Sequence, residues 1–281
     1  MRENQCCLRN VSKPGVEVNE SPRYCVVMPT YENAGTVCAV ADSVLAAGYH
    51  LIAVADGPHD GTAELLDGYR DRVTVVAYKE NRGKGHALSA GFAKAAEEGY
   101  DYAVTIDSDG QHSADDIPLL VEASLRNPGA VIVGRRAMEG VERPASSGFA
   151  NWFANFWFAV HTLRRFPDTQ SGFRCYPLSY YGKTRFFTSR YEAELEMLVR
   201  GAWNGIGMVA VPVRVYYPPR DERVSHFRKG RDFMRISLLN TVLTFAAVFY
   251  GYPSMLLHRL RKTFGKSGGS RSVSGKYGRE A

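Results

Sequence analysis

The sequence of 281 residues lacks the features that mark secreted, disulfide-bonded or zinc-stapled proteins. Its few cysteines follow no metal-ligand spacing, and their odd, scattered count favours reduced thiols and a cytosolic location: Cys6, Cys7, Cys25, Cys38 and Cys175. Residues 1–22 contain no apolar run of the signal-peptide kind, and their polar composition predicts a disordered arm. No internal repeat is evident, so we expect one large domain with an appendage.

Two common phosphate-binding motifs are also missing. The chain has no G-x-x-x-x-G-K-[ST] loop, and Pro29-Thr30-Tyr31-Glu32-Asn33 follows the first predicted strand in place of G-x-G-x-x-G. These absences exclude the P-loop and dinucleotide-binding classes. No recognised nucleic-acid signature is present, so we expect no nucleic-acid partner. A net charge of +6 and a pI near 9.0 nevertheless favour some anionic partner, such as a nucleotide, a lipid phosphate or a membrane.

What the sequence does contain is a regular alternation of short apolar runs with helical patterns. Strands are predicted at 24–28, 51–54, 73–77, 102–106, 130–133 and 208–215, and helices at 36–47, 63–69, 87–98, 115–125, 148–166 and 192–203. This order predicts an α/β fold with a mostly parallel sheet and flanking helices. Ligands of such folds bind at the carboxyl ends of the strands.

The end of the predicted strand 102–106 carries the strongest chemical signal. It runs into Asp107-Ser108-Asp109-Gly110-Gln111-His112. If the strand continues through the aspartates, both carboxylates face one side and repel each other, and a divalent cation relieves that repulsion. Hard oxygen ligands suit Mg²⁺ or Mn²⁺, which usually carry substrate phosphates. Because D-x-D pairs are common, a solvated strand-to-loop turn remains the alternative.

Several segments in a fixed order resemble the family-2 inverting glycosyltransferases of the GT-A fold, and within them the polyprenyl- and dolichol-phosphate sugar synthases. They are V-V-M-P-T-Y at 26–31, D-G-P-H-D-G-T at 56–62, N-R-G-K-G-H-A-L at 81–88, D-S-D-G-Q-H at 107–112, V-G-R-R at 133–136 and D-T-Q-S-G-F-R at 168–174. Several motifs in order are far more specific than any one of them. The resemblance covers about residues 22–220 and implies a Rossmann-like sheet of the GT-A type.

The resemblance also implies a donor site that holds a nucleotide sugar and a metal ion. The nucleoside pocket would be lined by Pro29, Thr30, Tyr31, Glu32 and Asp56. The donor diphosphate would lie near Lys84, Asp107 and Asp109. Mg²⁺ or Mn²⁺ would be held by Asp107, Asp109 and Gln111.

An acceptor site follows from the same resemblance. The phosphate of a lipid-linked acceptor would face Arg135, Arg136, Arg143 and Arg174, whose guanidinium groups match phosphate geometry. The catalytic group near the sugar would include Asp109, Ser171 and Arg174. Two departures affect the nucleoside pocket: the family commonly has two aspartates where this chain has Ala55-Asp56, and Asn-Glu where it has Glu32-Asn33. The sequence therefore leaves the identity of the nucleotide open.

Three glutamates lie at alternate positions of the predicted helix 192–203. Residues four apart share a helix face, so Glu192 and Glu196 point one way and Glu194 the other. We expect Glu194 or Glu196 to reach the active site, as an acidic residue of the corresponding helix does in relatives. A solvated helix face is the alternative.

The last part of the chain suggests contact with a membrane. Residues 236–257 carry no charged side chain and are flanked by basic residues on both sides. Their length suffices for a span, which needs about 20 residues, but polar residues within them favour surface or re-entrant contact. A buried core helix is a further alternative. We therefore expect an arm at 1–22, a GT-A domain at 23–220, a membrane-associating segment at 221–262 and a disordered tail at 263–281.

The leading hypothesis is a metal-dependent transfer of a hexose from a nucleotide sugar to a polyprenyl phosphate at the cytoplasmic face of a membrane. A phosphate acceptor is already anionic and needs positioning by cations rather than a base. One alternative is a hydroxylated lipid or small-molecule acceptor, which needs a general base. Another is a basic membrane- or nucleic-acid-binding module without catalysis.

Overall fold

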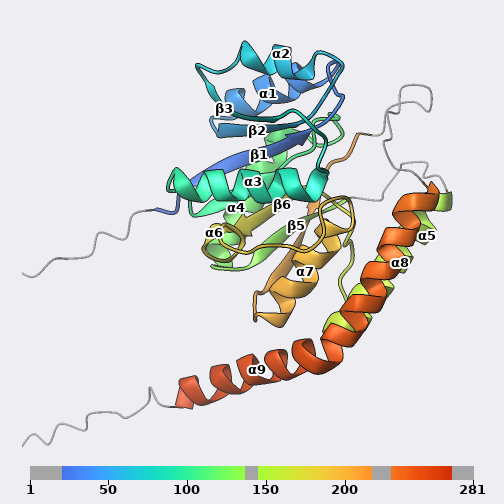
Figure 1. Ribbon diagram of the computed structural model, residues 1–281. Helices are drawn as coiled ribbons and strands as arrows, with labels where there is room; N and C mark the ends of the chain where they lie inside the picture. The colour runs from blue at the N-terminus through green and yellow to red at the C-terminus, as the bar shows by residue number, and fades with distance from the viewer. Residues whose placement is uncertain (1–20, 137–144, 217–228, 268–281) are drawn as a thin grey trace, which may run out of the picture.

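The computed structural model describes residues 21–136, 145–216 and 229–267, and these residues form a twisted sheet with helices on both faces (Figure 1). The sheet has seven strands in the order β3-β2-β1-β4-β6-β5-β7. In chain order they are β1 (Tyr24–Thr30), β2 (His50–Asp56), β3 (Val73–Tyr78), β4 (Tyr102–Thr105), β5 (Val131–Arg136), β6 (Arg174–Pro177) and β7 (Met208–Val213). The predicted α/β class with a mostly parallel sheet is confirmed.

Strand β6 was missed in the sequence. It lies between β4 and β5 and pairs antiparallel with both, whereas the other strand pairs of the described sheet are parallel. Its four residues, R-C-Y-P, are too few for a hydrophobic period to be visible and end in proline. The strand predicted at 102–106 does not continue through the aspartate pair, because β4 ends at Thr105 and Asp107 lies in the following loop.

Helices cover the two faces of the sheet because the strands are apolar on both sides. Successive residues of β1 point to opposite faces, so Val26 and Val27 belong to two separate core clusters. One face is covered by α1 (Val37–Ala46), α2 (Thr62–Asp67), a 3₁₀ turn (Ala114–Asp116) and α4 (Ile117–Arg126). The other is covered by α3 (Lys84–Glu97), α6 (Leu178–Tyr181) and α7 (Ala193–Trp203).

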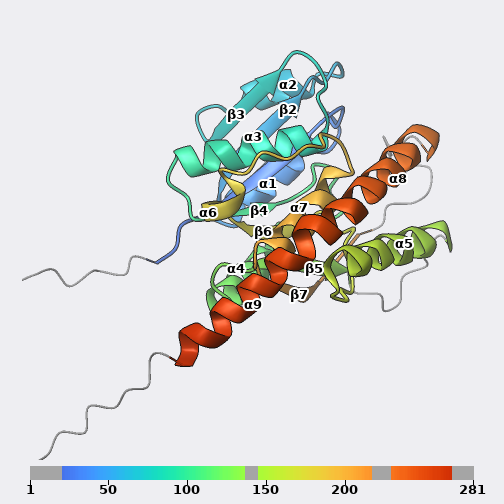
Figure 2. The same ribbon diagram turned by 60° about the horizontal axis from the view of Figure 1, so that its bottom comes forward.

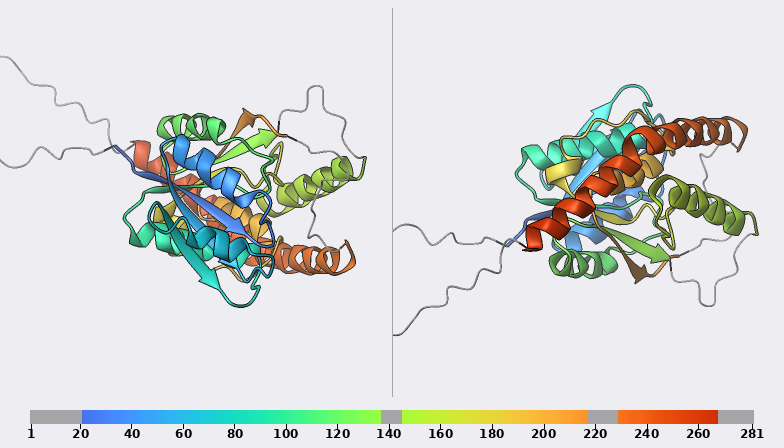
Figure 3. Two further views of the ribbon diagram at one scale, coloured as in Figure 1. Left: turned by 90° about the horizontal axis from the view of Figure 1, so that it is seen from above. Right: turned by 90° about the horizontal axis from the view of Figure 1, so that it is seen from below.

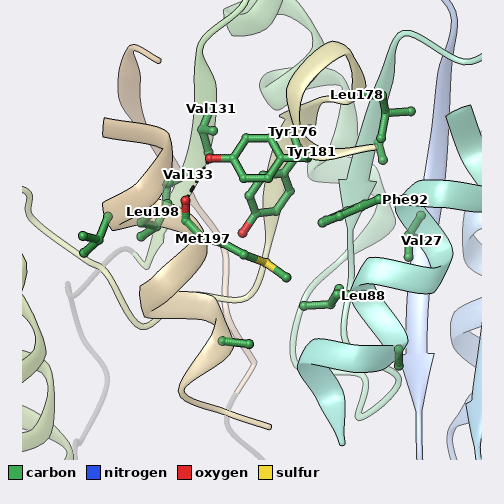
Figure 4. Packing of buried hydrophobic residues seen from close by; sticks show 14 of the residues in the cluster. Val27, Leu88, Phe92, Val131, Val133, Tyr176, Leu178, Tyr181, Met197 and Leu198 are labelled. Carbon is green, nitrogen blue, oxygen red and sulfur yellow. Dashed lines mark hydrogen bonds between the residues drawn. The ribbon is translucent and has the colours of Figure 1, made fainter. Parts of the chain in front are cut away.

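Buried side chains of α3, β6, α6 and α7 pack together in one core cluster, in which aromatic rings are prominent (Figure 4). The rings of Tyr176 and Tyr181 meet edge to face with centroids 4.7 Å apart, and Phe92 packs against both. The buried Tyr181 hydroxyl donates a hydrogen bond to the backbone oxygen of Met197 at 3.1 Å. This packing fixes the start of α7 relative to α3, and both helices deliver charged side chains to the site.

Three further helices extend from one side of the domain: α5 (Ala145–Thr162), α8 (Lys229–Ala246) and α9 (Tyr252–Ser267). Helices α5 and α8 project outward together, and α9 runs back beneath the domain (Figures 2 and 3). A π-helical turn at Ala247–Gly251 joins α8 to α9, where Figure 1 shows a bend. Gly251 packs against the indole ring of Trp203 so closely that a Cβ there would overlap it.

Candidate active site

The loop that carries Asp107 and Asp109 is held at the sheet edge by the buried Ser108. The Ser108 hydroxyl makes hydrogen bonds with the Thr30 hydroxyl at 2.9 Å and with the Asn33 amide nitrogen at 2.9 Å, and the Thr36 hydroxyl donates to the Ser108 backbone oxygen at 2.6 Å. These bonds join the ends of β1 and β4. The residue between the two aspartates therefore anchors the loop backbone that carries both carboxylates.

A lysine and two carboxylates meet next to this loop. The ammonium of Lys84, the first residue of α3, lies 2.8 and 3.0 Å from the two carboxylate oxygens of Asp107 and 3.1 Å from Oε2 of Glu194. Burial alone would lower the pKa of Lys84, but Asp107 and Glu194 raise it, so the lysine stays charged. Burial alone would raise the pKa of Asp107, but Lys84, assisted by His112 and Arg174, holds it below its ordinary value.

Asp109 and Gln111 complete the oxygen donors of the loop. Oδ1 of Asp109 accepts a hydrogen bond from the backbone N–H of Gln111 at 3.0 Å. Burial and the neighbouring charge of Asp107 raise the pKa of Asp109, so its negative charge is not fully compensated by the protein. Within the described ranges no three His, Cys, Asp or Glu side chains are arranged to hold a metal ion. Two carboxylates and an amide nevertheless suit a hard cation that completes its shell with phosphates and water.

Gly172, in the loop before β6, lies directly against the charged cluster. A Cβ at this position would lie 2.8 Å from Oδ2 of Asp107, 3.0 Å from Nζ of Lys84 and 3.2 Å from Oε1 of Glu194. Only glycine therefore leaves the three charged groups in their present positions.

Arg174 is fully buried, and its guanidinium supports the loop at 168–174. It donates hydrogen bonds to the backbone oxygens of Ser171, Thr169 and Glu194 at 2.6, 2.9 and 3.1 Å and to the Tyr176 hydroxyl at 2.8 Å. The predicted site residue Ser171 is likewise buried. Arg174 thus links this loop to the first turn of α7, and a contact of either residue with substrate stays a prediction.

Arg136 lies at the end of β5 and is held by the carboxylate of Asp168, which was not among the predicted site residues. Its Nε and a terminal nitrogen donate to the two oxygens of Asp168 at 2.8 and 2.9 Å, and Asp168 is 0% exposed. The Asp168 pKa stays below its ordinary value because hydrogen bonds and the charge of Arg136 outweigh its burial. Arg135 is exposed, and Arg143 lies outside the described residues.

The side chain of His112 packs on the loop between Gly172 and β6. It stacks on Phe173 with ring centroids 5.0 Å apart, and burial lowers its pKa. Phe173 follows Gly172, which lies against Asp107 and Lys84, and the Phe173 backbone oxygen accepts a hydrogen bond from the N–H of Gly134 in β5 at 2.8 Å. The carboxylate cluster and the end of β5 that carries Arg136 therefore both adjoin this loop. His112 and Asp168 both stand within motifs quoted above, but nothing in the sequence indicated their contacts.

The predicted nucleoside-binding residues occupy the ends of β1 and β2. The carboxylate of Asp56 is 2% exposed and accepts hydrogen bonds from the backbone N–H groups of Arg82 and Gly83 at 2.9 and 2.6 Å. It therefore holds the loop that precedes Lys84. Pro29 and Thr30 are buried, whereas Tyr31 and Glu32 are half-buried, and Glu32 has a φ of +52°. Contact of these residues with a nucleoside stays a prediction.

The helix with three glutamates places Glu194 and Glu196 in different surroundings. Glu194 joins Lys84 at the cluster, but Glu196 is fully buried on the other side of α7. There it accepts hydrogen bonds from the backbone N–H of Phe187 and of Thr188 at 2.9 and 2.8 Å and pairs with Arg200 at 2.9 Å. The structure brings Glu194, and not Glu196, together with the other predicted site residues.

The segment that follows β7 clamps the aspartate loop from outside. The guanidinium of Arg214 donates to Oδ1 of Asp116 at 2.9 and 2.6 Å, and the backbone N–H of Tyr216 donates to the oxygen of Gln111 at 2.8 Å. Val215 forms a bridge with His112 between these two contacts. The chain therefore touches the predicted metal loop on its way from β7 toward α8.

The outer helices present an exposed apolar surface. Phe249 is 80% and Met234 70% exposed, and the same helical stretch also exposes Leu238, Val242, Phe245, Val248, Leu256 and Leu257. One helical stretch, Met234–Arg261, is long and apolar enough to cross a membrane by length and composition. A cavity of about 610 Å³ lies between α7 and α8 and is lined largely by apolar side chains, including Trp203, Leu239 and Leu243.

Comparison with known proteins places this geometry among glycosyltransferases. The model of the family "Glycosyl transferase family 2" matches residues 25–181. A UDP-N-acetylglucosamine–dolichyl-phosphate N-acetylglucosaminyltransferase of Methanococcus voltae is 25% identical over 68% of this chain and 85% of its own. The polyprenol monophosphomannose synthase of Mycolicibacterium smegmatis is 27% identical over 70% of this chain and 78% of its own. The crystal structure of S. aureus TarS 1–349 in complex with UDP has a TM-score of 0.53 at 16% identity, covering 90% of this chain and 75% of that one, and so shares the fold.

Proposed function

The chain belongs to glycosyl transferase family 2, and from this membership we propose that it transfers a hexose from a nucleotide-diphosphate sugar to a polyprenyl-phosphate lipid. The transfer inverts the anomeric carbon and depends on Mg²⁺ or Mn²⁺. Relatives named for dolichyl-phosphate and polyprenol-phosphate acceptors support this acceptor class. The family identifies the chain as an enzyme, so the alternative of a binding module without catalysis is dropped.

The observation that carries the proposal is the position of Arg136 beside the carboxylate cluster. Asp168 orients its guanidinium through two hydrogen bonds of 2.8 and 2.9 Å, and the loop with Gly172 and Phe173, which adjoins the carboxylate cluster, is bonded to Gly134 of the same strand. A phosphate monoester placed against Arg136 thus lies next to the donor position. Its oxygen is already negative, so the acceptor needs orientation and no deprotonation.

The surroundings of Glu194 favour a phosphate acceptor over a hydroxyl acceptor. A hydroxyl needs a general base that is free to take up a proton. Glu194 is bound to the ammonium of Lys84 at 3.1 Å, so this carboxylate is already engaged by a charged partner. Glu196 is enclosed by Thr188, Phe187 and Arg200 and does not reach the cluster.

The donor would lie between Lys84 and the aspartates. Lys84 binds an oxygen of the diphosphate, and Asp107, Asp109 and Gln111 supply oxygen ligands for the cation. When bound, Mg²⁺ or Mn²⁺ neutralises the charge that develops on the departing nucleoside diphosphate. Gly172 leaves room for the charged ends of Asp107 and Lys84 at this point, because a Cβ there would lie only 2.8 Å from Oδ2 of Asp107.

The apolar surface of α8 and its continuation fits the same proposal. A polyprenyl tail stays in the bilayer while its phosphate enters the site, so the enzyme must sit on the membrane. Exposed side chains such as Met234, Phe245 and Phe249 would enter the apolar boundary of a lipid layer, with Arg235 and Arg259 on the same helices near its head groups. We place the enzyme on the cytoplasmic face as a peripheral or monotopic protein.

The test is transfer of radiolabelled sugar into lipid. Purified protein receives UDP-glucose, UDP-N-acetylglucosamine or GDP-mannose, with polyprenyl phosphate or the matching polyprenol, in Mn²⁺, Mg²⁺ or EDTA. We expect label in the organic phase only with the phosphate and the metal, and its loss in Asp109→Ala and Arg136→Ala. Arg126→Ala is the control, because Arg126 forms an exposed ion pair with Glu122 on α4. Transfer to polyprenol, or equal transfer in EDTA, contradicts the proposal.

A further inference from the structure

Lys84 already occupies the carboxylate that the proposed metal would use. Its ammonium lies 2.8 and 3.0 Å from the two oxygens of Asp107, which leaves neither oxygen free of a cation. A second carboxylate, Glu194, lies 3.1 Å from the same nitrogen. Lys84 is therefore a shared counter-ion between a predicted metal ligand and a carboxylate on another helix.

The net charge around Lys84 changes if either the cation or the diphosphate binds alone. Asp107, Asp109 and Glu194 face Lys84 and the buried Arg174, so the site has one negative charge in excess. A divalent cation alone would reverse that excess, and the diphosphate of a sugar nucleotide alone would enlarge it. Cation and diphosphate together return the site to its starting charge.

We propose that Lys84 is an exchangeable cation that holds Asp107 until a nucleoside diphosphate and a divalent metal bind together. This inference rests on the proposed function, because it concerns the order in which that site is filled. In the free enzyme Lys84 competes with the metal for Asp107. When the donor binds, its diphosphate offers Lys84 a new anion, and Glu194 keeps the ammonium nearby, so Asp107 becomes available to the metal.

The geometry explains why the exchange needs only a small movement. Both anionic partners of the ammonium are already within 3.1 Å, so Lys84 can release Asp107 without losing its contact with Glu194. Gly172 leaves no side chain in the way. Arg174 anchors the backbone of Glu194 at 3.1 Å, so the turn of α7 that carries this carboxylate is held while the lysine shifts.

Mn²⁺ binding, measured by electron paramagnetic resonance with and without UDP or GDP, tests the exchange. For the natural sequence we expect weak Mn²⁺ binding that the nucleotide strengthens, by about 5- to 150-fold if the coupling has the usual size. In Lys84→Gln, nucleotide-free Mn²⁺ binding should be tighter and the effect of nucleotide should largely disappear. Lys84→Arg keeps the charge and should still suppress nucleotide-free binding.

Lys94→Gln is the matched control, because it removes one positive charge from the same helix at an exposed ion pair with Glu97. It should leave Mn²⁺ binding unchanged. If Lys84→Gln does not fold, the double variant Lys84→Gln/Glu194→Gln removes both halves of the ion pair and should show the same tight, nucleotide-independent binding. Equal Mn²⁺ affinity in the natural sequence and both Lys84→Gln variants overturns the exchange. Failure of sugar transfer alongside a normal Mn²⁺ exchange would instead overturn the proposed function.

Discussion

Glu194 and Glu196 are two residues apart, yet replacing Glu196 should mainly lower the stability, whereas replacing Glu194 should mainly impair sugar transfer. Glu196→Ala removes a fully buried carboxylate that accepts hydrogen bonds from Phe187 and Thr188 and pairs with Arg200. The loop that these bonds hold packs against Gly83 and Gly85, so loss of the anchor also loosens the approach to Lys84.

The size of the stability effect follows from these contacts. Removing one partner of a buried ion pair costs about 3–5 kcal/mol of the free energy of unfolding. We expect about 3 kcal/mol, because Arg200 keeps its hydrogen bond to the backbone of Arg185 and its packing on Phe186 and Phe187. At roughly 2–4 °C per kcal/mol for a domain of this size, the melting temperature should fall by about 6–12 °C.

Thermal unfolding and sugar transfer, measured on the same preparations, separate the two glutamates. Glu194→Gln leaves Lys84 paired with Asp107, so the melting temperature should change by less than about 2 °C while transfer is impaired. Glu196→Ala should show the reverse order of effects, with transfer recovering toward normal at low temperature. An unchanged melting temperature together with lost transfer in Glu196→Ala would refute this reasoning, because it would make Glu196 a chemical participant.

Three further predictions concern the metal loop, the glycine against it and the apolar surface. Burial and the charge of Asp107 raise the pKa of Asp109, so the free energy of unfolding falls as the pH rises through that pKa. The variant Asp109→Asn should therefore have a higher melting temperature at neutral pH and should lose Mn²⁺ binding. Protons compete with Mn²⁺ for the Asp109 carboxylate, so the Mn²⁺ affinity of the natural sequence should fall as the pH is lowered; an affinity that does not change between neutral and acid pH would contradict the assignment. Gly172→Ala should weaken nucleotide and Mn²⁺ binding with little loss of stability, since the displaced groups are ends of flexible side chains; unaltered binding in a titration would contradict this. Phe249→Glu should weaken binding to anionic vesicles about tenfold or more in flotation assays, whereas Leu125→Glu, an exposed position on α4, should not; equal binding by both would remove α8 and its continuation from the membrane contact.

The sequence predicted the sheet well because each parallel strand is apolar on both faces and ends in a polar loop. It failed at β6, whose four residues carry no period and whose antiparallel direction depends on neighbours distant in the chain. The glutamate pattern correctly placed Glu192 and Glu196 on one helix face and Glu194 on the other. Which face meets the site depends on the packing of α7 against α3, and periodicity does not contain that information.

The contacts of the predicted site residues could not be predicted from the sequence. Arg136 and Lys84 are each held by a carboxylate from a different segment, Asp168 and Glu194. Such pairs are set by the tertiary fold, and a single sequence shows only that both charges exist. Asp56 has the same character, because its role in holding the 82–83 backbone appears only when β2 and the following loop are placed together.

The contacts of Arg214, Val215 and Tyr216 with the aspartate loop determine where a fusion junction can be placed in this enzyme. An engineer who wished to graft α8 and α9 onto another glycosyltransferase would naturally choose the end of β7 as the junction. With that junction, the graft would contain Arg214, which binds Asp116, and Tyr216, whose backbone N–H donates to the Gln111 oxygen, and the remaining domain would lose both contacts. A junction after Tyr216 keeps both contacts within the domain that binds the sugar nucleotide, so this domain ends three residues beyond its last strand.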